Sequence, residues 1–319
     1  MAVKISDIAA IANVNASTVS RALRGDERIQ PSTREMICKL ASELGYFPNL
    51  GAQQLANGKT GVVVVAAGML DYEYLGASVR EIDQVLSNQR YVLSVIPDSR
   101  NKERFIRTLR LFNQRFCDAA VLFSPIPQPD DLPELVQLQK KKFPLVCLDQ
   151  WLENYNIPAV SNDVNLSIQQ LGEKLCQHRI DAAAVFFPAE NTVATARRKA
   201  AEEFLAARNI PHVTDLMALP ELLKRHPKAR FGIFSDNPSL PILDQLFADN
   251  PPAGCIGCMF DSWKFNAPSC FDAIYLCIQD VETASQIAGR YLLRMMNGDF
   301  DIAPLTFVPP KEIFAPALR

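Results

Sequence analysis

The sequence predicts a chain of two parts: a small all-helical N-terminal domain and a larger α/β body built on parallel sheets. Within residues 6–23, two short apolar periodicities of helical spacing meet at a tight turn. From Gly61 onward, short β-rich runs alternate with amphipathic helical segments, which is typical of parallel strands joined by crossover helices. The 319 residues suffice for two or three domains, and 48% hydrophobic residues suffice for large buried cores.

The first helix is expected to begin at Ser6, an N-cap residue type, and to end at Asn13, which tolerates a left-handed backbone. Asn15 is positioned to cap a second helix, Ala16–Leu23. The outward face of this helix carries small polar side chains and one arginine: Ala16, Ser17, Thr18, Ser20 and Arg21. Such a face suits a helix that enters the major groove of duplex DNA. The pattern is a helix-turn-helix, although an ordinary helical hairpin is the structural alternative.

A third helix is expected over residues 32–44, where Gly45 ends it and its apolar stripe closes a three-helix core. Residues 48–57 form a short segment, and residues 57–60 link it to the body. Residues 1–60 contain 7 Lys and Arg against 5 Asp and Glu, whereas the remaining residues contain 26 and 30. A basic N-terminal domain on an acidic body fits contact with DNA at one end only.

The N-terminal region resembles the DNA-binding headpiece of the LacI/GalR family of bacterial repressors. The residues that carry this resemblance are Ile8-Ala9, Val14, residues 18–23, Thr33-Arg34, residues 44–49 and residues 52–56. It implies a helix-turn-helix domain over residues 1–47 and a hinge helix with linker over residues 48–60. In the family, the hinge helix orders when two subunits bind DNA, and its leucine, here Leu55, wedges into the minor groove. Packing within a linker is the alternative role of Leu55.

The resemblance further implies a homodimeric transcriptional regulator, a repressor, that binds double-stranded operator DNA. The expected DNA contacts are Ser6, Asn15, Ala16, Ser17, Thr18, Ser20, Arg21, Arg24, Asn49 and Leu55. Arg21 is suited to guanine, Ser17 to several bases and Ala16 to a thymine methyl group. Small polar side chains such as Thr18 more often contact phosphates, which fix position rather than sequence.

In the body, strands are expected over residues 62–66, 91–96, 119–123, 144–148, 182–187, 231–235, 255–259, 273–276 and 305–308. Helices are expected over residues 75–88, 102–116, 132–142, 164–177, 195–208, 220–226, 238–247 and 281–297. The resemblance implies that residues 61–319 form a doubly wound, periplasmic-binding-protein-like body that binds an effector and dimerises. Its two lobes would comprise about 61–160 with 281–319, and 161–280.

Ligands of doubly wound sheets bind outside the carboxyl ends of the strands. This rule and the resemblance select the effector contacts Asp71, Tyr72, Ser124, Asp149, Trp151, Arg197, Asp236, Asp261 and Trp263. The resemblance makes Arg197, or alternatively Arg198, the effector-binding arginine and Asp261 a carboxylate that binds hydroxyls. A sugar or sugar phosphate is the expected effector, and a purine-like metabolite is the alternative. Because residues 311–316 lack the arginine frequent in the family, a reduced or vestigial pocket is also possible.

Other classes of protein fit the sequence less well. The three histidines lie in no nucleophile motif and no phosphate-binding loop occurs, so we expect no enzyme. Cys255-x-x-Cys258 is an incomplete zinc pattern, so we expect no metal or other cofactor. A periplasmic carrier would need an export signal where the helix-turn-helix stands. No apolar run approaches a membrane span of ~20 residues, so we expect a cytoplasmic protein, nucleoid-associated on DNA, whose eight cysteines stay reduced.

Overall fold

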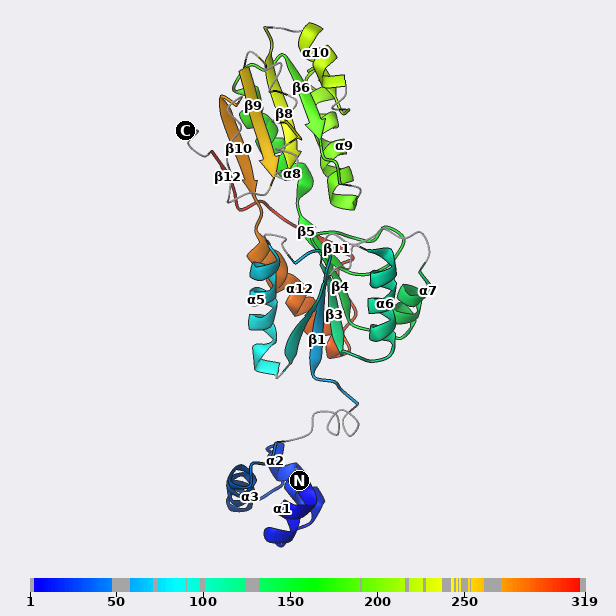
Figure 1. Cartoon of the computed structure of the whole chain (residues 1–319), viewed down its shortest axis with the longest axis vertical. Coiled ribbons are helices and arrows are strands. Elements are labelled where there is room, and N and C mark those ends of the chain that lie inside the picture. Colours follow the sequence, from blue (N-terminus) through cyan, green and yellow to red (C-terminus); the bar gives the residue numbers. More distant parts are fainter. Residues whose placement is uncertain are drawn as a thin grey trace. The chain divides into compact units, whose positions relative to one another are not determined.

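A computed structural model describes the N-terminal helices and most of the body. The described residues are 3–47, 58–70, 74–89, 91–97, 101–123, 132–189, 191–215, 218–225, 228–236, 242–243, 245, 247, 252, 254–260 and 271–315. The chain divides into an N-terminal unit, Met1–Thr60, and a body, Gly61–Arg319 (Figure 1). No helix of the described part combines the length and the apolar character needed to cross a bilayer.

The N-terminal unit contains three helices: α1 Ile5–Ile11, α2 Ala16–Leu23 and α3 Pro31–Glu43. Six side chains that are at most 7% exposed form its core: Ile8, Ala9, Val19, Ala22, Ile37 and Ala41. The turn between α1 and α2 depends on Asn13, which adopts a left-handed backbone with φ 51°. The prediction that Ser6 caps α1 is wrong, because Lys4 is the N-cap and its N–H donates to Asp7 Oδ2 at 2.9 Å.

The first sheet of the body contains six parallel strands in the order β11-β5-β4-β3-β1-β2. Its strands are β1 Val62–Ala67, β2 Val92–Ile96, β3 Ala119–Phe123, β4 Leu145–Leu148, β5 Ala159–Asn162 and β11 Leu305–Val308. Its helices are α5 Leu75–Leu86, followed by the turn η1 Ser87–Gln89, α6 Lys102–Asn113, α7 Pro133–Lys140 and α12 Val281–Met296.

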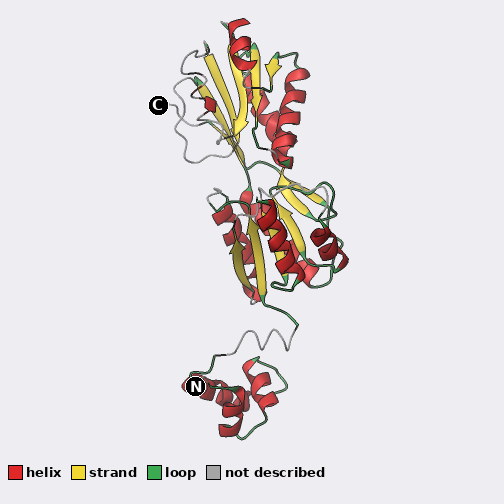
Figure 2. Ribbon diagram, turned by 45° about the vertical axis from the view of Figure 1, so that its right-hand side comes forward, coloured by secondary structure: helices red, strands yellow, loops and turns green. Residues whose placement is uncertain are grey.

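Strand β1 shows why the strands of this sheet are continuously hydrophobic. Val63 and Val65 pack in the core that includes α5 and α12, whereas Val64 and Ala66 pack in the core that includes α6 and α7. Alternate side chains point to opposite faces of a strand, so a sheet covered on both faces needs apolar residues at every position. Helices accordingly cover both faces of the first sheet (Figures 1 and 2).

The second sheet has the order β12-β10-β9-β8-β6-β7, and its strands are parallel except for β12, which runs antiparallel to β10. Its strands are β6 Ala182–Phe186, β7 His212–Val213, β8 Arg230–Asp236, β9 Gly254–Phe260, β10 Ala273–Ile278 and β12 Glu312–Phe314. The helices around it are α8 Val164–Cys176, α9 Thr192–Ala206 and α10 Leu219–Arg225.

The division of the body differs from the expectation in one segment. Helix α12 and strand β11 belong to the first sheet, as expected for residues 281–319. Strand β12 instead pairs with β10 in the second sheet, because the chain crosses back after β11 and fills the free edge of β10. Three short strands were not expected from the sequence: β5, β7 and β12.

Candidate nucleic-acid interface and ligand pocket

The face of α2 opposite the core is the exposed surface of the N-terminal unit with the expected contact residues. Val19 and Ala22 are buried, whereas Ala16, Ser17 and Arg21 are exposed. The exposed positions 17, 21 and 24 recur at helical spacing and therefore lie on one face. Such a face, with short side chains around arginines, can approach base edges closely.

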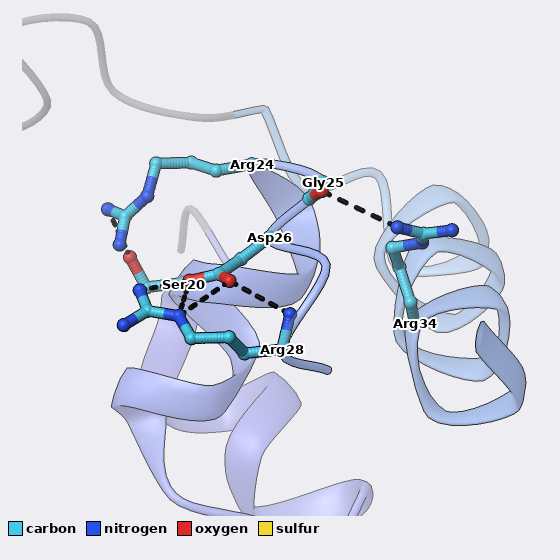
Figure 3. Close-up of polar contacts among 6 residues, drawn as sticks. All are labelled: Ser20, Arg24, Gly25, Asp26, Arg28 and Arg34. Atoms are coloured by element: carbon cyan, nitrogen blue, oxygen red, sulfur yellow. Dashed lines mark hydrogen bonds and ion pairs between the residues drawn. The ribbon is translucent and has the colours of Figure 1, made fainter. Parts of the chain in front are cut away.

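Arginine side chains surround the end of α2, and Arg24, Arg28 and Arg34 are held by contacts within the unit (Figure 3). Arg24 Nη1 donates to Ser20 Oγ at 2.9 Å, and Arg34 Nη1 donates to the Gly25 carbonyl at 3.4 Å. Arg28 forms an ion pair with Asp26. Within the described part of the chain, no hydrogen bond or ion pair holds the guanidinium of Arg21. Arg21 is therefore the arginine of this group that is free to reach a base edge.

The remaining expected DNA contacts fall at different depths. Ser6 is exposed on α1, and Asn15 is exposed at the N-cap of α2, where its side chain makes no capping bond. Thr18 and Ser20 are half-buried, which fits contact with the DNA backbone better than deep insertion into the groove. Asn49 and Leu55 lie outside the described residues, so the hinge contacts remain predictions.

In the body, a small hollow with room for about one water molecule lies at the carboxyl ends of β4 and β5. It is lined by Tyr74, Ser78, Phe123, Leu148, Asp149, Val160, Ser161, Asn162, Val281 and Ala284. The hydroxyls of Ser78 and Ser161 are buried without a hydrogen-bond partner among the described residues. Buried polar groups normally find a partner, so these hydroxyls provide sites for a hydroxylated ligand or for water.

Asp149 is the charged residue of this hollow and is only 8% exposed. It adopts φ 59°, a backbone conformation that aspartate tolerates better than most residues and that turns the chain sharply after β4. Asn162 Nδ2 donates to Asp149 Oδ1 at 3.4 Å and also donates to Gln279 Oε1. Sequence reasoning missed Asn162 and Gln279, although each is a polar residue at the end of a hydrophobic strand.

Arg197 lies elsewhere in the body, on α9. It is only 7% exposed, and its guanidinium carbon lies 4.0 Å from the centroid of the Phe260 ring at the end of β9. The neighbouring Arg198 donates to the Phe187 carbonyl at 2.7 Å, which gives it a structural contact. A buried guanidinium over an aromatic face is typical of an arginine oriented for a specific partner, so Arg197 is the better candidate of the two.

The other expected effector contacts are only partly described. Trp151 is half-buried and packs edge-on against Phe307 with ring centroids 6.1 Å apart, while Asp236 ends β8 and is half-buried. The Trp151 carbonyl also accepts a hydrogen bond from Thr192 Oγ1 at 3.2 Å. Outside the described residues lie Asp71, Tyr72, Ser124, Asp261 and Trp263.

The cysteines of β9 and β10 are packed in the core. Cys255, Cys258 and Cys277 are fully buried, and burial raises the pKa of the Cys258 thiol. No cluster of three or more metal-ligating side chains occurs in the described part of the chain. These thiols therefore behave as small apolar residues.

Comparison with known proteins identifies the N-terminal unit. Residues 4–49 match the family model of bacterial regulatory proteins of the lacI family. The transcriptional regulator MalR of Streptococcus pneumoniae is 29% identical over 51% of this chain and 50% of its own length. Residues 4–49 therefore belong to the lacI family of bacterial regulatory proteins.

The chain has further relatives of similar identity. Catabolite control protein A of Priestia megaterium is 27% identical over 51% of this chain and 48% of its own. The chain thus spans about half the length of MalR and of this protein. The fold is similar to that of the lac repressor dimer bound to operator and the anti-inducer ONPF, with a TM-score of 0.76 and 18% identity. The match covers 99% of this chain and 98% of the lac repressor chain. The CelR–cellobiose complex matches at TM-score 0.63 and 20% identity, covering 98% of each chain.

Proposed function

We propose that this chain is a transcriptional repressor that binds operator DNA as a homodimer and is controlled by a small molecule bound in its body. The observation that carries the proposal is the exposed α2 face of a lacI-family domain, where Arg21 has a free guanidinium among arginines held by other contacts. The relatives reported above support it, because one is named a transcriptional regulator and the other a catabolite control protein.

Base reading is assigned to Ala16 and Ser17 in the first turn of α2 and to Arg21 in its second turn. Arg21 would bind guanine through two hydrogen bonds, a contact worth about 1–3 kcal/mol of discrimination against another base. Ser17 and Ala16 would add a polar contact and a methyl contact. Two N-terminal units related by a two-fold axis would read a near-palindromic site.

For the effector, the body offers a carboxylate with hydroxyl and amide groups in one place and a buried arginine in another. Asp149 and Asn162 can accept from and donate to hydroxyl groups, which suits a sugar, and Arg197 suits an anionic substituent such as a phosphate. A sugar or sugar phosphate is therefore the proposed effector class. The fold similarity to a regulator solved with cellobiose supports a sugar.

Control would follow from a change in the body's conformational equilibrium. The chain passes between the two sheets at residues 162–164, 278–281 and 308–312, all of which are described. Asn162 and Gln279 join two of these passages by a hydrogen bond next to Asp149. A ligand bound at Asp149 would shift the equilibrium between two conformations of the body only to the extent that the ligand binds one conformation more tightly than the other.

The decisive experiment is a gel shift of the full-length chain with its own promoter and with random duplex. Arg21→Ala should weaken promoter binding by about 1–3 kcal/mol, or roughly 5- to 150-fold, and reduce the preference over random duplex. Lys39→Ala, which removes an exposed positive charge from α3, is the matched control and should leave that preference unchanged. Equal losses on both duplexes for Arg21→Ala would contradict base reading.

The effector is tested by thermal shift with sugars and sugar phosphates. Asp149→Asn should abolish the stabilisation that an active compound produces in the unmodified protein. An active compound that stabilises Asp149→Asn equally would exclude this part of the body as its site.

A further inference from the structure

A carboxylate lies among the arginines that follow α2. Asp26 accepts hydrogen bonds from Arg28 Nε at 2.9 Å and Nη2 at 2.6 Å, and from the Arg28 backbone N–H at 3.0 Å (Figure 3). The Asp26 side chain is 18% exposed, whereas that of Arg28 is 77% exposed. The guanidinium of Arg28 is thus exposed to solvent but bound through two nitrogens to a fixed carboxylate.

The position of Asp26 is determined by the end of α2. The Gly25 N–H donates to the Ala22 carbonyl at 3.0 Å, and the Asp26 N–H donates to the Arg21 carbonyl at 3.1 Å. Gly25 adopts φ 77°, which allows the chain to fold back onto the last turn of the helix. The carboxylate is therefore attached to the same helical turn as Arg21.

The electrostatic environment agrees with this placement. The hydrogen bonds from Arg28 hold the pKa of Asp26 far below its usual range, and the positive charge of Arg21 contributes in the same direction. Asp26 consequently stays ionised at any pH at which DNA binding is measured, and its negative charge acts on both Arg28 and Arg21.

Two consequences follow for contact with DNA. An unpaired exposed arginine binds phosphate of any sequence and releases counterions, so it strengthens binding to all duplexes. Arg28 can make such a contact only by breaking its bonds to Asp26. Asp26 also places negative charge beside the groove-facing helix, which disfavours approach to phosphates unless base contacts compensate for it.

We propose that Asp26 is a specificity-determining residue of this DNA-binding unit, which holds Arg28 away from phosphates and thereby lowers sequence-independent affinity. The proposal rests on the DNA-binding function proposed above. Asp26 itself contacts no base, so its effect is measured as a change in the ratio of promoter affinity to random-duplex affinity.

The test compares Asp26→Asn with Glu27→Gln in the full-length protein. Asparagine keeps an acceptor oxygen for the Arg28 N–H but lacks the charge that binds the guanidinium. Glu27 is exposed in the same loop, and its side chain forms no hydrogen bond or ion pair with the described residues. Glu27→Gln therefore changes the charge equally without freeing Arg28. Dissociation constants are measured for promoter and random duplex between 50 and 200 mM salt.

Asp26→Asn should bind random duplex more tightly and lose part of its promoter preference. The slope of log affinity against log salt concentration should steepen by about 0.9 per N-terminal unit, because Arg28 gains a phosphate contact. Over this salt range, the variant should therefore lose roughly threefold more affinity than the unmodified protein. Glu27→Gln should leave the promoter preference and the slope close to those of the unmodified protein.

A second variant isolates Arg28. Arg28→Gln should leave the salt slope of the unmodified protein unchanged but remove the added slope in the Asp26→Asn background. If Asp26→Asn prevents folding of the N-terminal unit, as seen by loss of helical circular dichroism, the test depends on Arg28→Gln alone. A salt slope shallower than that of the unmodified protein would then overturn the proposal. Equal behaviour of Asp26→Asn and Glu27→Gln would also overturn it.

These outcomes are distinguishable from failure of the proposed function. If the unmodified protein shows no preference for its promoter, the function itself is refuted. If it shows the preference and Asp26→Asn retains it in full with an unchanged salt slope, only the role of Asp26 is refuted.

Discussion

Truncation of one core side chain should unfold the N-terminal unit while leaving the body folded. Ile37 on α3 is 0% exposed and packs among the five other buried side chains of the core. Replacing it with alanine removes three carbons, which costs about 2.4 kcal/mol at ~0.8 kcal/mol each. The cavity left behind brings the expected loss to about 2–5 kcal/mol.

This loss is large relative to the stability that so small a unit can have. The 60 residues of Met1–Thr60 correspond to about 3–9 kcal/mol at ~0.05–0.15 kcal/mol per residue. A loss of about 3 kcal/mol raises the unfolded population on the order of 10²-fold. DNA affinity should fall in proportion to the folded fraction.

The positions of the tryptophans allow the two parts to be observed separately. Trp151 and Trp263 both belong to the body, so tryptophan fluorescence follows the body alone, whereas far-ultraviolet circular dichroism follows both parts. Ile37→Ala should lower the temperature of an early helical transition and weaken promoter binding, with an unchanged fluorescence transition.

A graded series controls for other effects of the substitution. Ile37→Val should cost only about 0.5–1.5 kcal/mol. Met36→Ala, at a neighbouring side chain that is 45% exposed, should change stability by about 0.5 kcal/mol or less. The reasoning is refuted if Ile37→Ala binds the promoter as the unmodified protein does, or if the fluorescence transition shifts together with the helical one.

Two further predictions concern the body. Gly172→Ala should destabilise the body by about 1–3 kcal/mol in denaturant titrations, because the added Cβ would lie 2.2 Å from the Phe204 ring. Gly76→Ala, whose added Cβ would have nothing within 4 Å, should be neutral or stabilising. Equal effects of the two substitutions would contradict the packing argument. Gln286 donates a hydrogen bond to Glu81 at 2.9 Å and lowers the pKa of this carboxyl group. The ionised carboxylate therefore stabilises the contact of α5 with α12 at any pH above about 4.3, the ordinary pKa of glutamate. This stabilisation is lost as the pH falls through the lower pKa of the folded protein. Glu81→Gln should therefore reduce the free energy of unfolding at pH 7 and lose its effect in acid, and an effect independent of pH would exclude this mechanism.

Local patterns in the sequence predicted most of the secondary structure. The helix-turn-helix follows from apolar spacing and from Asn13, whose left-handed backbone is a property of the residue itself. The α/β fold class, which the structural comparisons confirm, follows from the alternation of strand-like and helix-like runs. Short edge strands such as β7 and β12 were missed, because two or three residues carry too little periodicity.

The sequence by itself determined the surface of α2 as a candidate DNA contact, because one helix presents its own side chains in a known order. Only the tertiary structure decided which polar groups surround Asp149. Asn162 follows it by 13 residues, and Gln279 lies another 117 residues further along the chain. The order of strands in the first sheet and the return of the chain from the second sheet bring these residues together, and no local pattern encodes that order. The ion pair of Asp26 and Arg28, by contrast, joins residues two positions apart, and it forms in a loop that Gly25 folds back onto the last turn of α2.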